Sequence, residues 1–199
     1  MNMYMIRHGE SMANAEHLHA GWSQTPLSPK GEEEAQRLAE LLKHYRFDKV
    51  YSSDLLRAKQ TKAIALPDAD AIFTGVLREI SVGELAGKHA DVCLQQYGAR
   101  YLTDKAARDY RFFGGENRDM HLARVKEFMD TVALQEAEEI AVFCHEGTIR
   151  CALEAACDGQ AYQRPLKNCG VYLFEYKNAV WKFKNQIEDI TPNVNKEEA

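Results

Sequence analysis

Met3-Tyr4-Met5-Ile6-Arg7-His8-Gly9-Glu10-Ser11 joins a short apolar run to a polar run near the start of the 199-residue chain. The continuous apolar run is typical of a strand that is covered on both faces of a sheet. Arg7 and His8 would then stand at the carboxyl end of this strand, where ligands bind in open α/β sheets. Gly9 allows the backbone to turn sharply beside them. We therefore expect an anion-binding site with an imidazole at the end of the first strand.

A second apolar run, at residues 140–144, also ends at a histidine, His145. Shorter strands are expected at residues 48–52 and 71–74, and a hairpin is expected at residues 171–176 and 180–184. Because parallel strands place their carboxyl ends at one edge of a sheet, His8 and His145 should lie close together at that edge.

Helices are expected between these strands. Ser28 followed by Pro29 is a helix start, with a hydroxyl cap and then proline at the first helical position. Further helices are expected from a cap at Asp54, within residues 90–111, and from a cap at Asn117 to about Leu134. Another is expected over residues 148–156, ended by Asp158-Gly159. The alternation of strands and helices predicts an α/β fold, a three-layer α/β/α sandwich with a mainly parallel central sheet.

Length and composition fit one domain. Hydrophobic residues make up 45% of the chain and charged residues 28%, which is an ordinary globular mixture. We expect a single domain over residues 1–190, in which about residues 83–115 form a cap over the site. The polar residues 191–199 are expected to fray.

Charge and cysteine content exclude several classes of function. The net charge of −5 disfavours nucleic acid as a partner, and no apolar run is long enough to span a membrane. The cysteines form no CxxC pair and no zinc-type spacing. We expect no cofactor. Reduced cysteines and the absence of a signal-peptide pattern lead us to expect a cytoplasmic protein.

The polar residues expected at the sheet edge suit phosphoryl chemistry. Two arginines bind phosphate oxygens through planar forks that keep their charge, and an imidazole is a competent nucleophile toward phosphorus. A carboxylic acid can protonate the leaving oxygen and then accept a proton from water, and Glu79 is the candidate. The expected set comprises Arg7, His8, Asn14, Arg57, Glu79 and His145.

The stretch from Arg7 to Ser11, with Asn14, resembles the signature of the histidine phosphatase superfamily, the phosphoglycerate mutase-like proteins. The resemblance continues in the order of the family's motifs as far as about Arg150. The further matching segments are Gly21-Trp22 with Pro26-Leu27-Ser28 and Lys30-Gly31, Ser52 to Leu55 with Arg57-Ala58 and Gln60-Thr61, Leu77 to Ile80 with Gly83-Glu84 and Gly87, Gly114-Gly115-Glu116, and His145 with Gly147 and Ile149-Arg150.

The resemblance implies a role for each matching residue. His8 becomes the phosphohistidine nucleophile, and Glu79 becomes the proton donor. Arg7, Arg57 and His145 bind the phosphoryl group of a small phosphorylated substrate, and Asn14 assists them. Gly21 and Glu146 are further expected substrate contacts, and we expect Glu146 to present only its backbone N–H. No metal is implied.

Two departures from the family pattern favour a phosphatase over a mutase. Mutases carry an arginine and a tyrosine after the acid, where this chain has Ile80 and Val82, and they carry a longer basic insertion. The alternatives are a phosphoglycerate mutase, or a catalytically idle phosphate-binding protein on the same fold. The family usually has a small residue at the position of Glu146, and this departure keeps the catalytically idle alternative open.

Several single residues have simpler interpretations. Asn14 has an alternative as the cap of a turn, and Glu79 as a loop acid paired with Arg78, but the phosphate and acid roles are favoured. The histidines outside the motifs are expected on the surface or at the pocket rim: His17, His19, His44, His89 and His121.

Overall fold

The computed structural model describes residues 1–156 and 165–187. In this part of the chain, one six-stranded sheet has the order β3-β2-β4-β1-β5-β6. The first four strands in this order are parallel, and β5 and β6 are antiparallel to their neighbours. The strands are β1 (Asn2–Arg7), β2 (Lys49–Ser53), β3 (Ile72–Thr74), β4 (Glu139–Cys144), β5 (Val171–Lys177) and β6 (Val180–Ile187).

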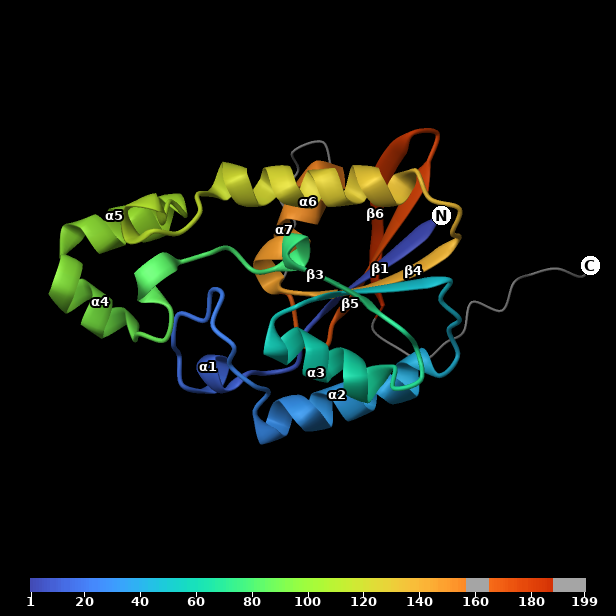
Figure 1. The fold of residues 1–199 in the computed structure, drawn as a ribbon, viewed down its shortest axis with the longest axis horizontal. Helices are drawn as coiled ribbons and strands as arrows, with labels where there is room; N and C mark the ends of the chain where they lie inside the picture. Colours follow the sequence, from blue (N-terminus) through green and yellow to red (C-terminus); the bar gives the residue numbers. More distant parts are fainter. Residues whose placement is uncertain (157–164, 188–199) are drawn as a thin grey trace, which may run out of the picture.

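Helices cover both faces of the sheet, as Figure 1 shows, with α2 and α3 on one side and α6 and α7 on the other. The α/β three-layer prediction is confirmed. The helices of the described part are α1 (Met12–Ala15), α2 (Pro29–Leu42), α3 (Leu56–Ala65), α4 (Ala90–Tyr97), α5 (Ala99–Ala107), α6 (Arg118–Ala133) and α7 (Glu146–Ala156), with 3₁₀ turns η1 (Gly75–Leu77), η2 (Gly83–Leu85) and η3 (Arg111–Phe113).

Two of the predicted helix caps are present. The Ser28 hydroxyl accepts a hydrogen bond from the amide of Gly31 over 3.1 Å, and the Asn117 side chain accepts one from the amide of Met120 over 2.8 Å. These bonds satisfy amides at the helix start that have no partner within the helix.

The predicted cap at Asp54 is wrong. Helix α3 begins after Leu55, which makes no side-chain capping bond. The Asp54 carboxylate instead accepts two hydrogen bonds from Arg78, at 2.6 and 2.7 Å. Because the guanidinium binds both carboxylate oxygens and carries a full charge, this pair outcompetes a single bond to a backbone amide at the helix start.

Other boundaries differ slightly from the sequence prediction. Helix α7 starts at Glu146 rather than at residue 148, and its expected end at Asp158-Gly159 lies outside the described residues. The expected helical stretch at 90–111 is broken at Gly98, which has φ +56°. The turn between β5 and β6 centres on Asn178 and Ala179, which both have positive φ.

The buried side chains form separate clusters that explain the layers. One cluster lies between the sheet and α6 and α7, and includes Met5, Val125 and Ile149. The opposite cluster includes Ile6 and Leu38, under α2. Since Met5 and Ile6 are adjacent in β1, their side chains face opposite sides of the sheet, as a strand buried on both faces requires.

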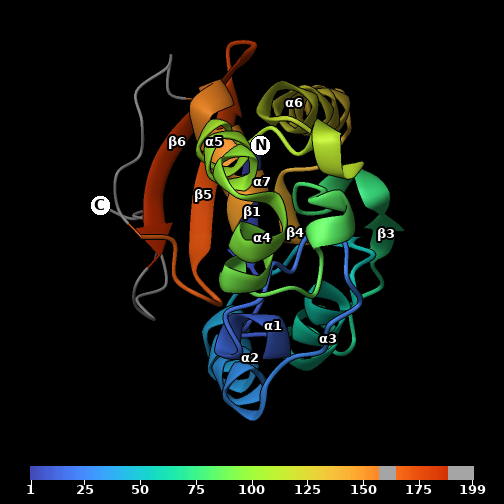
Figure 2. The same ribbon diagram turned by 90° about the vertical axis from the view of Figure 1, so that its left-hand side faces the viewer.

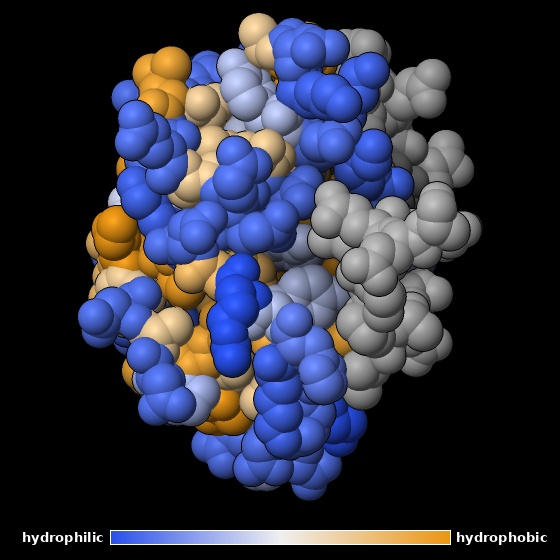
Figure 3. Space-filling view, turned by 90° about the vertical axis from the view of Figure 1, so that its right-hand side faces the viewer, coloured by the Kyte–Doolittle hydropathy of each residue, from blue (hydrophilic) through white to orange (hydrophobic). Residues whose placement is uncertain are grey.

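A third cluster lies within the segment between β3 and α6 and includes Leu85, Tyr101 and Phe113. Figure 2 shows α4 and α5 of this segment at the end of the molecule toward which β1 and β4 run. Figure 3 shows the opposite end, where polar residues dominate and apolar ones form scattered patches. Residues 191–199, the expected tail, lie outside the described part. Within the described ranges, no helix is both long and apolar enough to cross a membrane.

Candidate active site

The register of the sheet brings His8 and His145 together. Arg7 in β1 pairs with Cys144 in the parallel strand β4, so the next residue of each strand stands at the same level. The ring centroids of the two histidines are 5.1 Å apart. His8 is 4% exposed and His145 is fully buried. The two apolar runs therefore deliver two imidazoles to one point at the sheet edge, as the sequence predicts.

The hydrogen bonds of His8 define its tautomer. Its Nδ1 lies 2.6 Å from the carbonyl oxygen of Gly9, which can only accept, so Nδ1 carries the proton. Its Nε2 accepts a hydrogen bond from Nε of Arg57 over 3.2 Å. Burial, reinforced by the charge of Arg57, holds the pKa of His8 well below its usual range. His8 is thus a neutral imidazole with a lone pair on Nε2.

Arg57 on α3 is held in place by backbone carbonyls. Its Nη2 donates to the carbonyl of Gly21 over 2.9 Å and its Nη1 to the carbonyl of Ser23 over 3.1 Å. Burial lowers the pKa of Arg57 to about 10, so the guanidinium remains charged at neutral pH. Gly21 therefore holds Arg57 through its carbonyl, and this is the contact that the structure shows for it.

His145 is anchored on one nitrogen. Its Nε2 lies 2.8 Å from the hydroxyl of Ser53, at the end of β2. Its Nδ1 is buried and has no hydrogen-bond partner among the described residues. Burial, followed by the charge of Arg57, lowers the pKa of His145 well below its usual range. The other buried side-chain polar atoms without a partner in the described part are Nε of Arg7, Nδ1 of His121 and Nε1 of Trp181.

Arg7 is anchored in a similar way. Its Nη1 donates to the carbonyl of Leu166 and lies 3.2 Å from Oε2 of Glu146. Its Nε is buried without a partner in the described part. The Nη1 corner of the guanidinium is thus anchored.

The expectation for Glu146 is corrected by the structure. Its side chain does not turn away from the site: Oε2 approaches Arg7, and Oε1 accepts two hydrogen bonds from Arg150 at 2.8 and 3.1 Å. Because α7 already begins at Glu146, Arg150 lies one turn later on the same face. The resulting charged chain, Arg7 to Glu146 to Arg150, borders the site.

Glu79 lies beside the start of α7. Its Oε2 accepts a hydrogen bond from the amide of Gly147 over 2.9 Å, and its Oε1 accepts one from the amide of Ile80 over 2.8 Å. The ion pair with Arg78 that the sequence left open is absent, because Arg78 binds Asp54 instead. A cavity of about 450 Å³ opens at Glu79, and its lining residues are Glu79, Ile80, Arg108, Tyr110, Glu146, Gly147 and Arg150.

Asn14 caps a turn in this structure, and its phosphate role stays a prediction. Its Oδ1 accepts hydrogen bonds from the amide and hydroxyl of Ser11, at 3.1 and 2.9 Å, and the Ser11 hydroxyl accepts from the amide of Asn14. This reciprocal pattern is a capping box at the start of α1.

The prediction that His121 lies on the surface or at the pocket rim is wrong. Its side chain is fully buried, and its Nε2 lies 3.3 Å from the hydroxyl of Thr148. Burial lowers the pKa of His121 to about 3. His121 lies on the inward face of α6. A polar residue in the sequence gives no indication of such burial.

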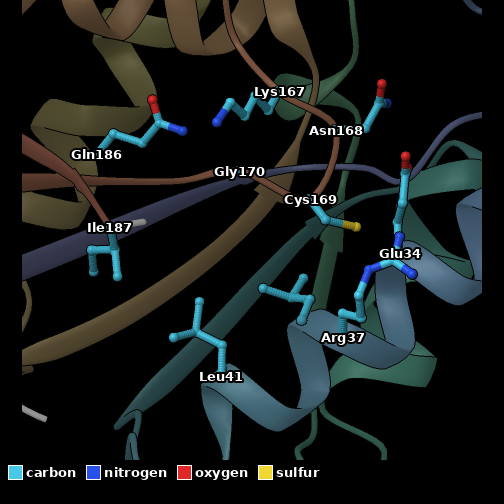
Figure 4. Close-up of a pocket in the computed structure, with 10 residues that line it drawn as sticks. Glu34, Arg37, Leu41, Lys167, Asn168, Cys169, Gly170, Gln186 and Ile187 are labelled. Carbon is cyan, nitrogen blue, oxygen red and sulfur yellow. The ribbon is translucent and has the colours of Figure 1, made fainter. Parts of the chain in front are cut away.

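The loop before β5 supports the end of β1 from behind. The Asn168 side chain donates to the carbonyl of His8 over 2.9 Å, and the amide of Cys169 donates to the carbonyl of Arg7 over 3.0 Å. Figure 4 shows the outer side of this loop, where Asn168 and Cys169 border a pocket of about 600 Å³. These contacts were not predicted, because no motif marks the loop in the sequence.

Within residues 1–156 and 165–187, no group of three or more His, Cys, Asp or Glu side chains is arranged to hold a metal ion.

Comparison with known proteins gives consistent results. Residues 3–188 match the family model of the histidine phosphatase superfamily (branch 1). The probable phosphoglycerate mutase GpmB of Enterobacter sp. (strain 638) is 28% identical over 98% of this chain and 94% of its own length. The corresponding protein of Salmonella paratyphi A is 27% identical over 91% of this chain and 87% of its own.

Solved structures show the same fold. An α-ribazole phosphatase from Shigella flexneri superposes with a TM-score of 0.85 at 24% identity, and covers 92% of this chain and 95% of its own. A phosphoglycerate mutase from Bacillus anthracis has a TM-score of 0.79 at 22% identity, with 92% and 91% coverage.

Proposed function

Because the chain belongs to the histidine phosphatase superfamily, we propose that it is a phosphomonoesterase that hydrolyses a small phosphorylated metabolite through a phosphohistidine on His8. The observation that carries this proposal is the hydrogen bond from Arg57 to Nε2 of His8. It places a fixed cation beside an unprotonated nitrogen, whose lone pair accepts this bond and must leave it to attack phosphorus. A nucleophile toward phosphorus needs both an unprotonated nitrogen and a nearby positive charge for the phosphoryl oxygens.

The phosphoryl group would bind beside His8, where Arg57 and His145 lie close to it. Nε of Arg7 and Nδ1 of His145 are buried without partners in the described part, so both side chains would have to shift for these nitrogens to meet phosphoryl oxygens. Arg57 would transfer its Nε donation from His8 to an oxygen as the new bond forms. Phosphoryl transfer needs mainly such positioning and charge stabilisation.

The reaction then has two steps. In the first, Nε2 of His8 forms a bond to phosphorus, the bond from phosphorus to the leaving oxygen breaks, and protonated Glu79 gives its proton to that oxygen. In the second, Glu79 takes a proton from water, the water oxygen bonds to phosphorus, and the bond from phosphorus to His8 breaks. The position of Glu79, bound to the amide of Gly147 beside His145, supports this role.

The competing function is a phosphoglycerate mutase, which is what the names of the relatives at 27–28% identity favour. The residues after the acid argue against it. Ile80 and Val82 are 6% and 5% exposed and belong to the cluster within the α4–α5 segment. Neither can bind a carboxylate. A catalytically idle protein is disfavoured because Arg7, His8, Arg57, Glu79 and His145 are all present.

A hydrolysis screen against phosphomonoesters tests the proposal, with His8→Ala as the paired variant. We expect phosphate release by the wild type, no release by the variant, and no effect of a chelator. A phosphoenzyme should form that survives alkali and is lost in acid, as a phosphoramidate does. Interconversion of phosphoglycerates without phosphate release would favour the mutase, and equal activity of His8→Ala would overturn the proposal.

A further inference from the structure

Arg124, in the middle of α6, uses every N–H of its guanidinium on one loop and one acid. Its Nη1 donates to the carbonyls of Val76 and Arg78, both over 2.7 Å, and its Nη2 donates to the carbonyl of Glu79 over 2.9 Å. The remaining two donors, Nε and Nη2, each reach a carboxylate oxygen of Glu116 over 2.9 Å. A guanidinium has five N–H groups, so this arginine is fully satisfied.

Glu116 holds the same loop from its other end. Its Oε2 accepts a hydrogen bond from the amide of Ser81 over 2.9 Å, and its own amide donates to the carbonyl of Ser81 over 2.9 Å. Burial raises the pKa of Glu116, but the bonds from Arg124 and the Ser81 amide outweigh it, so the pKa is lowered and the carboxylate stays ionised.

The two side chains therefore fix the backbone on both sides of Glu79. The segment they hold, residues 76–81, contains only one regular turn at its start, η1, and is otherwise irregular. Arg124 and Glu116 are 16% and 11% exposed. Burying two charges costs desolvation energy that their attraction often does not recover, so such a pair is weak evidence for a stabilising role. Apart from the bonds that the two side chains make with each other, all their side-chain hydrogen bonds go to the loop that carries the acid.

We propose that Arg124 and Glu116 are positioning residues that set the direction in which Glu79 delivers its proton. This inference rests on the proposed function. Two amide bonds orient the Glu79 carboxylate locally, and the arginine and glutamate fix the backbone from which that carboxylate extends. Loosening the backbone should impair proton delivery more than nucleophilic attack, because His8 and Arg57 are held by other parts of the chain.

Dependence on the leaving group separates this role from a merely structural one. We would measure kcat and KM of Arg124→Lys and Glu116→Gln on p-nitrophenyl phosphate, whose leaving group departs readily, and on an alkyl phosphate, whose leaving group needs a proton. General acids contribute on the order of 10²- to 10⁴-fold. We expect kcat on the alkyl phosphate to fall at least about tenfold more than kcat on p-nitrophenyl phosphate. In a Glu79→Gln background, the additional selective loss should vanish.

Arg118→Lys is the matched control, because Arg118 lies on the same helix and forms a more exposed ion pair with Glu154. It should leave both rates unchanged. Equal losses on the two substrates, or no loss, in Arg124→Lys and Glu116→Gln would overturn the inference while His8-dependent hydrolysis by the wild type leaves the proposed function standing. Absence of that hydrolysis in the wild type would overturn both. If Arg124→Lys fails to fold, Glu116→Gln decides, because the amide keeps an acceptor for the Ser81 N–H.

Discussion

Nε of Arg57 donates a hydrogen bond to Nε2 of His8 over 3.2 Å, so the proposed nucleophilic nitrogen is in direct contact with a buried cation. The contact joins the end of β1 to the first turn of α3, 49 residues later in the chain. It requires His8 to be neutral, because a protonated Nε2 would have no lone pair to accept the bond.

Arg57→Lys is expected to lower kcat/KM by about 10²- to 10³-fold, the usual cost of losing a preorganised donor at a reacting group. Lysine keeps the charge but lacks the planar fork that reaches His8, Gly21 and Ser23 together. Steady-state kinetics on p-nitrophenyl phosphate measure the loss. The exposed Arg37→Lys variant is the control and should behave as wild type. A change of less than tenfold in Arg57→Lys would contradict the assigned contact.

The lowered pKa values of His8 and His145 predict where these rings titrate. An ordinary imidazole is half protonated at a pH of about 6.5. Since burial and Arg57 lower both pKa values well below this, both rings should remain neutral from pH 8 to pH 6 in phosphate-free buffer. Histidine ring resonances followed by NMR test this, with His8→Ala to assign one of them. A midpoint at or above 6.5 for either ring would refute it.

The fold and the convergence of the two histidines were predictable because both depend on local patterns. Each of the two apolar runs is long enough for a strand and is followed by a histidine, His8 or His145. The sequence therefore shows where each strand ends and which side chain lies at its end. The helix starts at Ser28 and Asn117 were equally local, since each cap bonds an amide within three residues. Asp54 shows the limit: its position suits a cap, but a distant arginine, Arg78, competes for the carboxylate.

The contacts that support the site could not be predicted from the sequence, because they involve backbone groups or pair residues that are far apart along the chain. The carbonyl of Leu166 and the amide of Cys169 hold Arg7 without any side-chain motif. Arg124 resembles any polar helix residue until the fold places it against the loop of Glu79. The side-chain direction of Glu146 depends on the residue at which α7 begins, which the sequence placed two residues too late.

Glu146→Gln is expected to tighten binding of inorganic phosphate, by about tenfold. The Glu146 carboxylate lies 3.2 Å from Arg7, and a negative charge there opposes a dianion in the adjacent site. Glutamine removes the charge and keeps an oxygen that accepts from Arg7 or Arg150. The inhibition constant of phosphate measures the effect, and Glu154→Gln, on the same helix and similarly half-buried, controls for net charge. Weaker phosphate binding by Glu146→Gln would show instead that the carboxylate serves mainly to orient Arg7.

Stability should fall in mild acid. His8, His121 and His145 are buried with lowered pKa values, and that of His121 is about 3. Below pH 6.5 the unfolded chain binds protons at these residues and the folded chain does not, so stability present above pH 6.5 is lost as the pH falls toward the folded pKa values. Each such group contributes up to about 1.4 kcal/mol per pH unit.

Urea unfolding at pH 7.5, 6.5 and 5.5 measures this dependence. The free energy of unfolding should decrease most between pH 6.5 and pH 5.5. His121→Gln, which removes one of the three rings, should reduce the slope in that interval whatever its effect at pH 7.5. A free energy of unfolding that stays constant or rises toward pH 5.5 would contradict the burial of neutral imidazoles.

Gly147→Ala should separate activity from folding. A methyl group at this position would lie 2.0 Å from Oε1 of Glu79 and 3.0 Å from Nη2 of Arg108. Both are ends of flexible side chains, so they can move aside, and alanine is a better helix former than glycine by about 1 kcal/mol. The free energy of unfolding should therefore change by no more than about 1 kcal/mol.

The Glu79 carboxylate, however, cannot keep its place against the amide of residue 147 once the methyl group is there. We expect kcat on an alkyl phosphate to fall by at least about tenfold more than kcat on p-nitrophenyl phosphate, because only the former needs the acid. Gly75→Ala is the matched control, since the three atoms nearest its methyl group would all belong to the Arg78 side chain, at 3.5 Å or more. If Gly147→Ala hydrolysed both substrates at the wild-type rate, Glu79 could not be the proton donor from the position it holds beside α7.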